Sequence, residues 1–518
     1  MAVRRIAWVI PALLLWLLFP AGLTPAPVLA QVESSIIYVA ATNTIEVKRP
    51  GAVVTLSDID DALRDENLLE RAGQREWRLK ANLKIFELVR LELHGDDAGG
   101  DVNRLKLNSG PSGFVSIESS NGQISIRSTR ITSWDEAADT FDTDFLDGSG
   151  RAYISAKNRT SVYTDNRMDV IDSEIAYLGF FEETAYGISW KVISEEGGPN
   201  PGILGKGMTG TVTGSKFHHN YFGLYVWGVG DMEVRNNEFY DNYGYGFDAH
   251  TVTQRVTVEN NFSHDNGLHG IIFADRCTEN VVRGNRSVNN EGHGIMLHEL
   301  SDDNTIEDNE VTGNSDGVAL FESSNNAVTG NIIRDNVTGI RIYGRAAASA
   351  DNIIRDNEIR GNSSYGVFMY DAATGNSFSN NLIVANGDSG VYLKAADDNI
   401  FVDNEINDNE YGIRLDSAEE RNRSTGNQFR DNTIQDNRNY GVYSYPPEGR
   451  NRFEGNLYSG NALGDITYLT RNPLLGGGRL GIIRLVLLGA IIAVALTTAV
   501  MFLLRWRRQP PPTHGAGG

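Results

Sequence analysis

A glycine followed by an aliphatic or aromatic residue recurs along much of the chain at a nearly constant interval. The copies begin at Gly223, Gly246, Gly270, Gly294, Gly317, Gly339, Gly366, Gly390, Gly412 and Gly441. The steps between them are mostly 22 to 24 residues. An asparagine recurs in phase, each time directly before a short strand-like run, at Asn237, Asn261, Asn285, Asn309, Asn331, Asn357, Asn381, Asn404, Asn432 and Asn456. Two markers with one period indicate one structural coil per repeat.

The residues between these markers favour strands joined by tight bends. Each repeat is rich in Asn, Asp and Gly, contains short β-branched runs and lacks helical periodicity. Gly and Asn accept the positive φ that such bends need, so most of the Asn and Asp residues are interpreted as turn residues. Stacked coils bury their aliphatic residues in a common core. The sequence therefore predicts an all-β fold, a right-handed parallel β-helix.

The ends of the chain set the predicted domain boundaries. Arg4 and Arg5 precede an apolar stretch and a small-residue cleavage pattern, which predicts a signal peptide over residues 1–30. Residues 31–165 are predicted to hold an N-terminal segment and the first, irregular coils, and residues 166–470 the catalytic and binding β-helix. A juxtamembrane linker (471–484) leads to an apolar run (485–504) long enough for a transmembrane helix, followed by an arginine-rich tail (505–518). The predicted protein is therefore a single-pass membrane protein with an extracellular or periplasmic N-terminal domain and a cytoplasmic C-terminus.

Charge and cysteine content exclude some classes of protein. The formal net charge of −21 should repel nucleic acid. Cys277 is the single cysteine, so an intrachain disulfide cannot stabilise the exported domain, and the stacked repeats must do so.

Aligning the repeat copies separates inward from outward side chains. Positions one and three after the glycine stay apolar and are predicted to point into the core, so positions two and four point outward. The outward positions are rich in aromatic and basic residues, and those predicted to bind substrate are Tyr225, Trp227, His298, Arg341, Tyr343, Phe368, Tyr370, Tyr392, Lys394 and Arg414. Aromatic rings can lie against sugar rings, while cations pair with carboxylates, so the face fits an acidic polysaccharide. An aromatic ladder that only stabilises the stack is the alternative.

The segment from Tyr245 to His250 contains the residues most typical of a catalytic site. Asp248 and His250 share one outward face, and Arg276 belongs to the next coil, with its Cα roughly 8 Å from that of His250. An acid, an imidazole and a guanidinium suit removal of a proton next to a substrate carboxylate. His269, which precedes the next repeat glycine, is predicted to extend the substrate contacts. No close His, Cys and Asp spacing is typical of a metal site, so no metal or other cofactor is expected, although calcium bound by turn aspartates is left open.

These residues resemble a known family. Residues 171–342 are similar to the catalytic β-helix of the mannuronan C5-epimerases of alginate biosynthesis: the similar stretches are Ser173–Gly179, Tyr245–His250 and His269–Ile272 with Arg276, preceded by Thr132–Asp135 and Arg151–Ile154. The resemblance implies that His250 removes the C5 proton of a uronic acid residue, that Arg276 neutralises the adjacent carboxylate, and that Asp248 orients the histidine or the sugar. Water or Tyr245 would return a proton to the opposite face. Ala249 and Thr251 replace a proline and an acid of the family's signature.

Two other functions remain open at this point. A polysaccharide lyase begins with the same proton removal but then expels the C4 oxygen, and a non-catalytic surface protein could keep the binding face without the chemistry. The expected partners are a polyuronate, the membrane through the C-terminal helix, and a polysaccharide synthase or export complex.

Overall fold

The computed structural model describes residues 35–145, 150–159, 166–193, 204–415, 423–444 and 450–468. They fall into two compact units, which divide between Gly292 and His293. Among these residues, no helix is long and apolar enough to cross a membrane. The predicted signal peptide, juxtamembrane linker, transmembrane helix and tail all lie outside the described residues.

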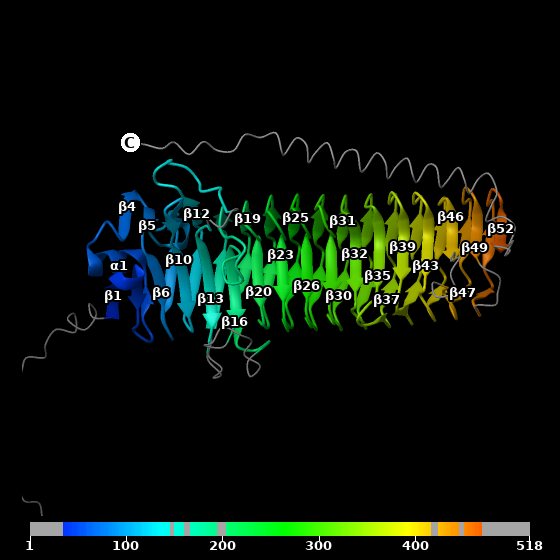
Figure 1. The fold of residues 1–518 in the computed structure, drawn as a ribbon, viewed down its shortest axis with the longest axis horizontal. Coiled ribbons are helices and arrows are strands. Elements are labelled where there is room, and N and C mark those ends of the chain that lie inside the picture. The colour runs from blue at the N-terminus through cyan, green and yellow to red at the C-terminus, as the bar shows by residue number, and fades with distance from the viewer. Residues whose placement is uncertain are drawn as a thin grey trace, which may run out of the picture. The chain divides into compact units, whose positions relative to one another are not determined.

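Unit 1 consists of coils that each contribute three strands, one to each of three parallel sheets, which are called A, B and C here (Figure 1). Sheet A contains β2 (Thr44–Val47), β6 (Asn82–Ile85), β10 (Ser116–Ser120), β13 (Tyr153–Asn158), β16 (Ile188–Val192), β20 (Leu224–Trp227), β23 (Phe247–His250) and β26 (Ile271–Ala274). Sheet B contains β3 (Val53–Val54), β7 (Arg90–His94), β11 (Gln123–Arg127), β14 (Asn166–Ile171), β18 (Thr211–Thr213), β21 (Glu233–Arg235), β24 (Thr257–Glu259) and β27 (Val281–Arg283). Sheet C contains β5 (Glu76–Leu79), β8 (Arg104–Gly110), β12 (Arg130–Trp134), β15 (Glu174–Ala176), β19 (Lys216–His218), β22 (Glu238–Tyr240), β25 (Phe262–His264) and β28 (Arg286–Val288).

The first coils of unit 1 carry additional short elements. These are β1 (Ile36–Val39), β4 (Leu69–Gly73) and β9 (Gly113–Phe114), which pair antiparallel with β2, β5 and β8 respectively, and α1 (Leu56–Leu63). Two 3-10 turns (Ala40–Thr42 and Asp96–Ala98) and β17 (Met208–Thr209) complete the unit.

Unit 2 repeats the three-strand coil. Its sheet A contains β29 (Ile295–His298), β32 (Asp316–Phe321), β35 (Thr338–Tyr343), β39 (Tyr365–Tyr370), β43 (Ser389–Lys394), β46 (Tyr411–Leu415), β49 (Tyr440–Ser444) and β52 (Gly464–Tyr468). Its sheet B contains β30 (Thr305–Glu307), β33 (Ala327–Thr329), β37 (Ile353–Arg355), β41 (Ser377–Ser379), β44 (Ile400–Val402), β47 (Gln428–Arg430) and β50 (Arg452–Glu454). Its sheet C contains β31 (Glu310–Thr312), β34 (Ile332–Arg334), β38 (Glu358–Arg360), β42 (Leu382–Val384), β45 (Glu405–Asn407), β48 (Thr433–Gln435) and β51 (Leu457–Ser459). A small pair, β36 (Ser349–Ala350) and β40 (Ala373–Thr374), lies apart from these sheets.

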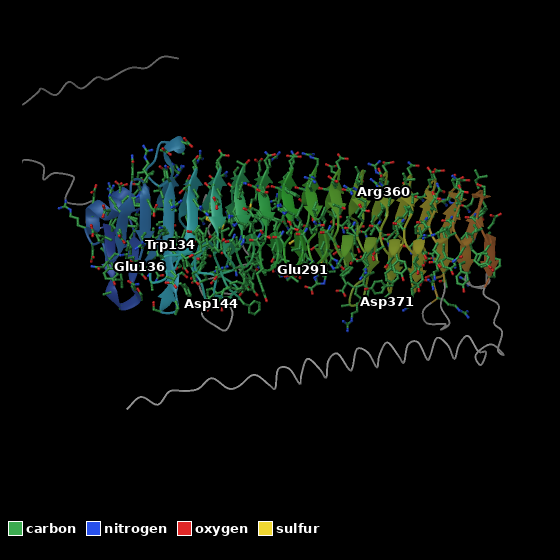
Figure 2. All side chains as sticks on the ribbon, turned by 90° about the horizontal axis from the view of Figure 1, so that it is seen from above. Trp134, Glu136, Asp144, Glu291, Arg360 and Asp371 are labelled. Carbon is green, nitrogen blue, oxygen red and sulfur yellow. The ribbon has the colours of Figure 1, made fainter. Side chains whose placement is uncertain are left out.

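The core of each unit is built from the side chains predicted to point inward. Phe247 and Ala249 in unit 1, and Ile340 in unit 2, are completely buried. A Cβ atom on Gly246 would lie only 2.7 Å from the carbonyl oxygen of Gly270, so the repeated glycine is needed because backbones of adjacent coils approach closely there. Charged tips such as those of Glu291 and Arg360 lie on the outside of the coils (Figure 2).

Buried asparagines at the corners between strands connect each coil to the next. The amide nitrogen of Asn261 donates to the carbonyl oxygen of Val234 at 2.9 Å and to Oδ1 of Asn285 at 3.0 Å. Its own Oδ1 accepts from the backbone N–H of Asn237 at 2.9 Å. The residue before it, Asn260, has φ of +55°, a left-handed conformation that asparagine tolerates. The asparagine repeat therefore satisfies corner backbone groups that would otherwise be buried without partners.

Replacing Asn261 with alanine is expected to lower the free energy of unfolding by about 3 kcal/mol, because several buried donors and acceptors lose their partner at once. Chemical denaturation of both proteins measures the difference. The control is Asn260→Asp, at an exposed corner position, for which we expect a change within about 0.5 kcal/mol. Equal effects of the two substitutions would contradict a role for the buried ladder.

Candidate active site

The strand pairing of sheet A in unit 1 places two of the predicted catalytic residues, Asp248 and His250, on one outward face. In the register between β20 and β23, Tyr225 pairs with Asp248 and Trp227 pairs with His250. The intervening Ala249 is completely buried in the core. Because side chains alternate along a strand, the side chains of Asp248 and His250 project from the same side of β23.

His250 is the last residue of β23 and lies beside a sharp corner. Its Nδ1 lies 2.7 Å from the hydroxyl oxygen of Thr251. The hydroxyl of Thr253 donates to the backbone carbonyl of His250 at 2.8 Å. The Tyr225 ring lies against the imidazole, with 6.4 Å between ring centroids. These contacts hold the backbone and the ring of the predicted base.

Asp248 lies deeper than His250 and is only 2% exposed. Its Oδ1 has no hydrogen-bond partner among the residues that the structure describes. Burial raises the pKa of Asp248 to about 8. Its charge also contributes to the raised pKa values of Tyr186, Tyr225 and Tyr245, in which burial is the larger cause. Asp248 is therefore an acid enclosed by tyrosines and largely protonated at neutral pH.

Replacing Asp248 with asparagine is expected to stabilise the fold by an amount that grows as the pH rises from about 4 to about 8. The folded carboxyl keeps its proton up to a pKa of about 8, whereas an unfolded one loses it near 3.8. The folded state therefore binds more protons across this interval, and the stability of the wild-type protein falls there as pH rises. Urea unfolding of both proteins at a series of pH values tests this expectation, and a constant difference across the interval would contradict it.

Arg276 lies two residues after β26, at the corner one coil beyond His250. Its guanidinium is bound to Asp275, with Nε 2.8 Å from Oδ1 and Nη2 3.1 Å from Oδ2. The side chain remains 57% exposed. A guanidinium that is held at one edge and open to solvent can still receive a substrate carboxylate.

Lys191 on β16 belongs to the same face, although it was not predicted from the sequence. Its side chain is completely buried, and Nζ lies 3.8 Å from the ring centroid of Trp227. Nζ also donates to the carbonyl oxygen of Glu183 at 2.9 Å. Burial lowers the pKa of Lys191 to about 8. Gly187-Ile188 is an earlier copy of the repeat marker, and extending the alignment to it would have placed Lys191 outward.

Aromatic residues cover one side of this face. We call this group the aromatic wall; it consists of Phe145, Phe181, Tyr186, Tyr221, Phe222, Tyr243 and Tyr245, whose rings contact one another. Phe181 and Tyr243 are 75% and 51% exposed, which is unusual for such large rings. Tyr245 itself lies at the corner before β23 and stacks on the predicted contact residue His269, with 5.2 Å between centroids.

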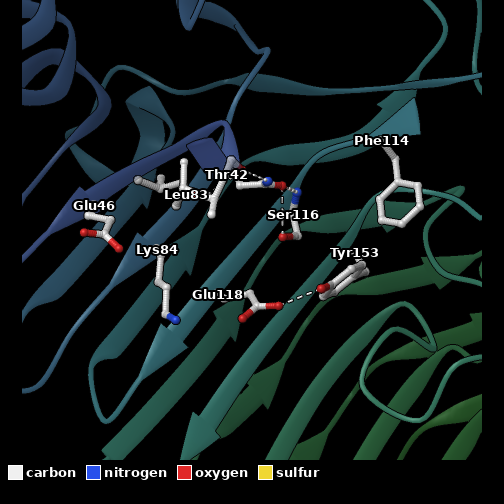
Figure 3. Close-up of a pocket in the computed structure, with 10 residues that line it drawn as sticks. Thr42, Glu46, Leu83, Lys84, Phe114, Ser116, Glu118 and Tyr153 are labelled. Atoms are coloured by element: carbon white, nitrogen blue, oxygen red, sulfur yellow. Dashed lines mark hydrogen bonds between the residues drawn. The ribbon is translucent and has the colours of Figure 1, made fainter. Parts of the chain in front are cut away.

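A pocket of about 420 Å³ opens on the outward face of sheet A in the earlier coils of unit 1 (Figure 3). In it, the Tyr153 hydroxyl donates to Glu118 at 2.6 Å. Asn82 and Lys84 also line the pocket. None of these residues was predicted from the sequence as part of a site, because the repeat markers are absent from this part of the chain.

In unit 2, two of the three predicted substrate-binding cations, Arg341 and Arg414, form ion pairs within the protein. Nη2 of Arg341 lies 2.9 Å from the fully buried carboxylate of Asp316, and Nη1 of Arg414 lies 3.1 Å from that of Asp388. Lys394 pairs with Tyr370 in the strand register. Part of the predicted positive charge is therefore already neutralised.

The predicted aromatic residues of unit 2 pack on one another. Tyr343 stacks on Tyr370 at 4.3 Å, and Phe368 stacks on Tyr370 at 4.8 Å and on Tyr392 at 5.1 Å between centroids. His298 lies edge-on to Phe321 at 6.4 Å. Rings that stack on one another expose their edges to solvent and leave fewer ring faces for contact with sugars. This arrangement favours a role of these residues in stabilising the stack of coils, in addition to any binding of substrate.

The stacked three-strand coils define a parallel β-helix protein. A family model described as the right-handed β-helix region matches residues 201–352 and 345–474, which together exceed half of the chain. The chain therefore belongs to the right-handed β-helix family.

Its curated relatives include mannuronan C5-epimerases, in agreement with the motif resemblance. The enzyme of Pseudomonas putida is 24% identical over 309 residues, covering 57% of this chain and 56% of the relative. AlgG of Azotobacter vinelandii is 31% identical over 247 residues, covering 47% and 45%. The chain thus spans about half the length of the curated relatives it matches.

A solved structure confirms the fold. The crystal structure of the periplasmic alginate epimerase AlgG superimposes with a TM-score of 0.57 at 18% identity, covering 82% of this chain and 85% of that one. At this level of identity the likeness establishes the shared β-helix.

Proposed function

We propose that this protein is a polysaccharide-modifying enzyme that inverts C5 of mannuronate residues in a polyuronate, as its relatives' name describes. The observation that carries the proposal is the group of residues formed by Asp248 and His250 on β23 and by Arg276 at the corner after β26. The His250 side chain projects from the outward face beside the buried Asp248. Arg276 lies one coil later, and its guanidinium is partly exposed. The similarity of the chain to mannuronan C5-epimerases supports the assignment.

In the proposed reaction, His250 takes the proton from C5 and Arg276 pairs with the carboxylate next to that carbon. Removal of the proton places negative charge on the carboxylate oxygens, so a guanidinium at that position lowers the barrier by stabilising the enolate-like intermediate. A proton then returns to the opposite face of C5, and the configuration is inverted. The reaction transfers protons only, so we propose that it needs no cofactor.

Tyr245 and Lys191 are the side chains that we propose as donors for the returning proton, with water as the alternative. Burial, with a smaller contribution from Asp248, raises the pKa of Tyr245 to about 12, so this phenol carries its proton at neutral pH. Lys191, with its pKa lowered to about 8, gives up a proton more readily than an ordinary lysine.

We assign Asp248 a role in binding the sugar. With a pKa of about 8, the carboxyl is mostly neutral at pH 7 and can donate a hydrogen bond from inside an apolar enclosure. A neutral acid also avoids repelling the negative charge of a uronate, so the buried carboxyl is compatible with an acidic substrate.

Tyr225 and Trp227, predicted as exposed contacts, are only 4% and 7% exposed and support the site from beneath. Substrate contacts are proposed for His269 beside His250, and for the aromatic and basic residues of unit 2 predicted from the repeat. The protein is also proposed to act outside the cytoplasm, anchored by residues 485–504 and next to a polysaccharide synthase or export complex. The apolar run followed by arginines supports the anchor. The solved relative AlgG is a periplasmic protein, which supports the compartment.

Product analysis tests the proposal against its alternatives. The full-length protein is incubated with polymannuronate, and the product is examined by proton NMR. Guluronate signals in chains of unchanged length are expected. Unsaturated chain ends would instead identify a lyase, and binding of the polymer without any change in it would identify a non-catalytic surface protein.

A further inference from the structure

Thr251 connects the predicted base to a carboxylate on the next coil. Its hydroxyl donates to Oδ2 of Asp275 at 2.8 Å, while the same oxygen lies 2.7 Å from Nδ1 of His250. The three groups thus form a continuous hydrogen-bonded series that runs from β23 to the corner after β26.

The direction of each bond in this series follows from counting protons. An ionised carboxylate can only accept, so the single hydroxyl proton of Thr251 must point toward Asp275. The oxygen of Thr251 can then only accept from Nδ1 of His250. A neutral imidazole that carries its proton on Nδ1 has its lone pair on Nε2, and Nε2 is therefore the basic nitrogen.

The charge of Asp275 is maintained by its neighbours. Burial pushes the pKa of Asp275 upward, but hydrogen bonds from Arg276 and Thr251, with the charges of Arg276 and His250, together hold it below the usual value. The carboxylate binds Thr251 through Oδ2 and Arg276 through both oxygens. One acid therefore contacts Arg276 directly and His250 through a hydroxyl, so it touches both the residue proposed to bind the substrate carboxylate and the residue proposed to remove the proton.

The backbone at this corner is strained in a way that fixes the series. Thr251 and Val252 have φ of +40° and +57°, which β-branched residues rarely adopt. Their N–H groups donate to the carbonyl oxygens of Ala274 and Asp275 at 3.0 and 2.9 Å, so the two corners stack directly on each other. Strain of this kind persists where the surrounding structure enforces it, and it concentrates at functional sites.

We propose that Asp275 is a positioning residue that acts through Thr251 to fix the Nδ1-protonated form of His250, and that it orients Arg276 with the same carboxylate. This role rests on the proposed function of His250 as the base. Thr251 and an acid from the next coil thus stand where the family signature has an acid directly after the histidine.

The tautomer of His250 is measurable without any substrate. The full-length protein is labelled with ¹⁵N-histidine, and long-range ¹⁵N–¹H correlation spectra identify which ring nitrogen carries hydrogen, with His250→Gln used to assign the signal. We expect the Nδ1–H form in the wild-type protein and a loss of that preference in Thr251→Val and Asp275→Asn. Thr251→Ser, which keeps the hydroxyl, should restore the wild-type pattern. An Nε2–H form in the wild-type protein, or a pattern unchanged by Thr251→Val, would overturn the proposal.

Kinetics give a second readout. Asp275→Asn retains a side chain that tolerates the left-handed φ of +62° at this position, and we expect it to lower the rate of C5 exchange by about 100-fold. Adding Thr251→Asp to that variant places a carboxylate next to His250 and should recover about tenfold of the loss. A double variant no faster than Asp275→Asn would contradict the relay. If the protein acted on no polyuronate at all, the proposed function would fail, while the tautomer measurement would still decide the role of Asp275.

Discussion

Replacing His250 with glutamine is expected to slow C5 proton exchange on polymannuronate by about 1,000-fold. Glutamine keeps a polar side chain of similar length but cannot accept a proton from carbon at neutral pH. Because His250 points away from the core, the free energy of unfolding should change by less than about 1 kcal/mol. Exchange rates by NMR and denaturant unfolding of the same preparations provide the two measurements.

His264, on sheet C of the same unit, serves as the matched control. It also ends a short strand and hydrogen-bonds to the residue that follows it, Asp265, at 2.7 Å. His264→Gln should leave the exchange rate within about twofold of the wild type, because a substitution remote from the reacting residues leaves their geometry intact. If His250→Gln retained wild-type exchange, another residue would have to be the base.

The second large effect is expected for Arg276→Ala, with a loss of about 100-fold in kcat/KM. The variant lacks the positive charge that stabilises the developing enolate. Arg276→Lys should recover only part of this loss, because an ammonium cannot reproduce the planar two-point contact of a guanidinium with a carboxylate. Steady-state kinetics on polymannuronate of defined length measure both variants.

Arg286→Ala is the control for the arginine substitutions. Its guanidinium lies over the Phe262 ring at 4.7 Å on sheet C, away from the outward face of sheet A. We expect normal kinetics for this variant. Equal losses in the two alanine variants would point to a general effect of charge and would remove the specific role of Arg276.

The repeat predicted the fold because both of its markers have a direct structural cause. Gly246 is required where two backbones approach closely, and Asn261 is required where corner groups need partners inside the core. The alternation around each glycine also predicted correctly that Phe247 and Ala249 point inward. These constraints act within one coil and its neighbour, so they appear in the sequence at a fixed period.

Much of the candidate site depends on contacts that have no such period. In the sequence, Thr251 occupies the position of an acid of the family signature. Only the stacked corners show that its hydroxyl is bound to the carboxylate of Asp275. Lys191 lies before the regular repeats, at an irregular spacing of 36 residues from Gly187 to Gly223. The ion pair between Arg341 and Asp316 joins two coils, and the sequence alone did not reveal which acid would neutralise which base.

We propose that residues on the outward face of sheet A in unit 1, with His250 as the base, remove and return the proton at C5. This claim is tested most directly by incubating the full-length protein with polymannuronate in deuterated water and locating the deuterium by NMR. We expect deuterium at C5 in residues of inverted configuration, within chains of unchanged length, and no incorporation with His250→Gln. Bound polymer with no deuterium at C5, or equal incorporation with His250→Gln, would contradict the claim.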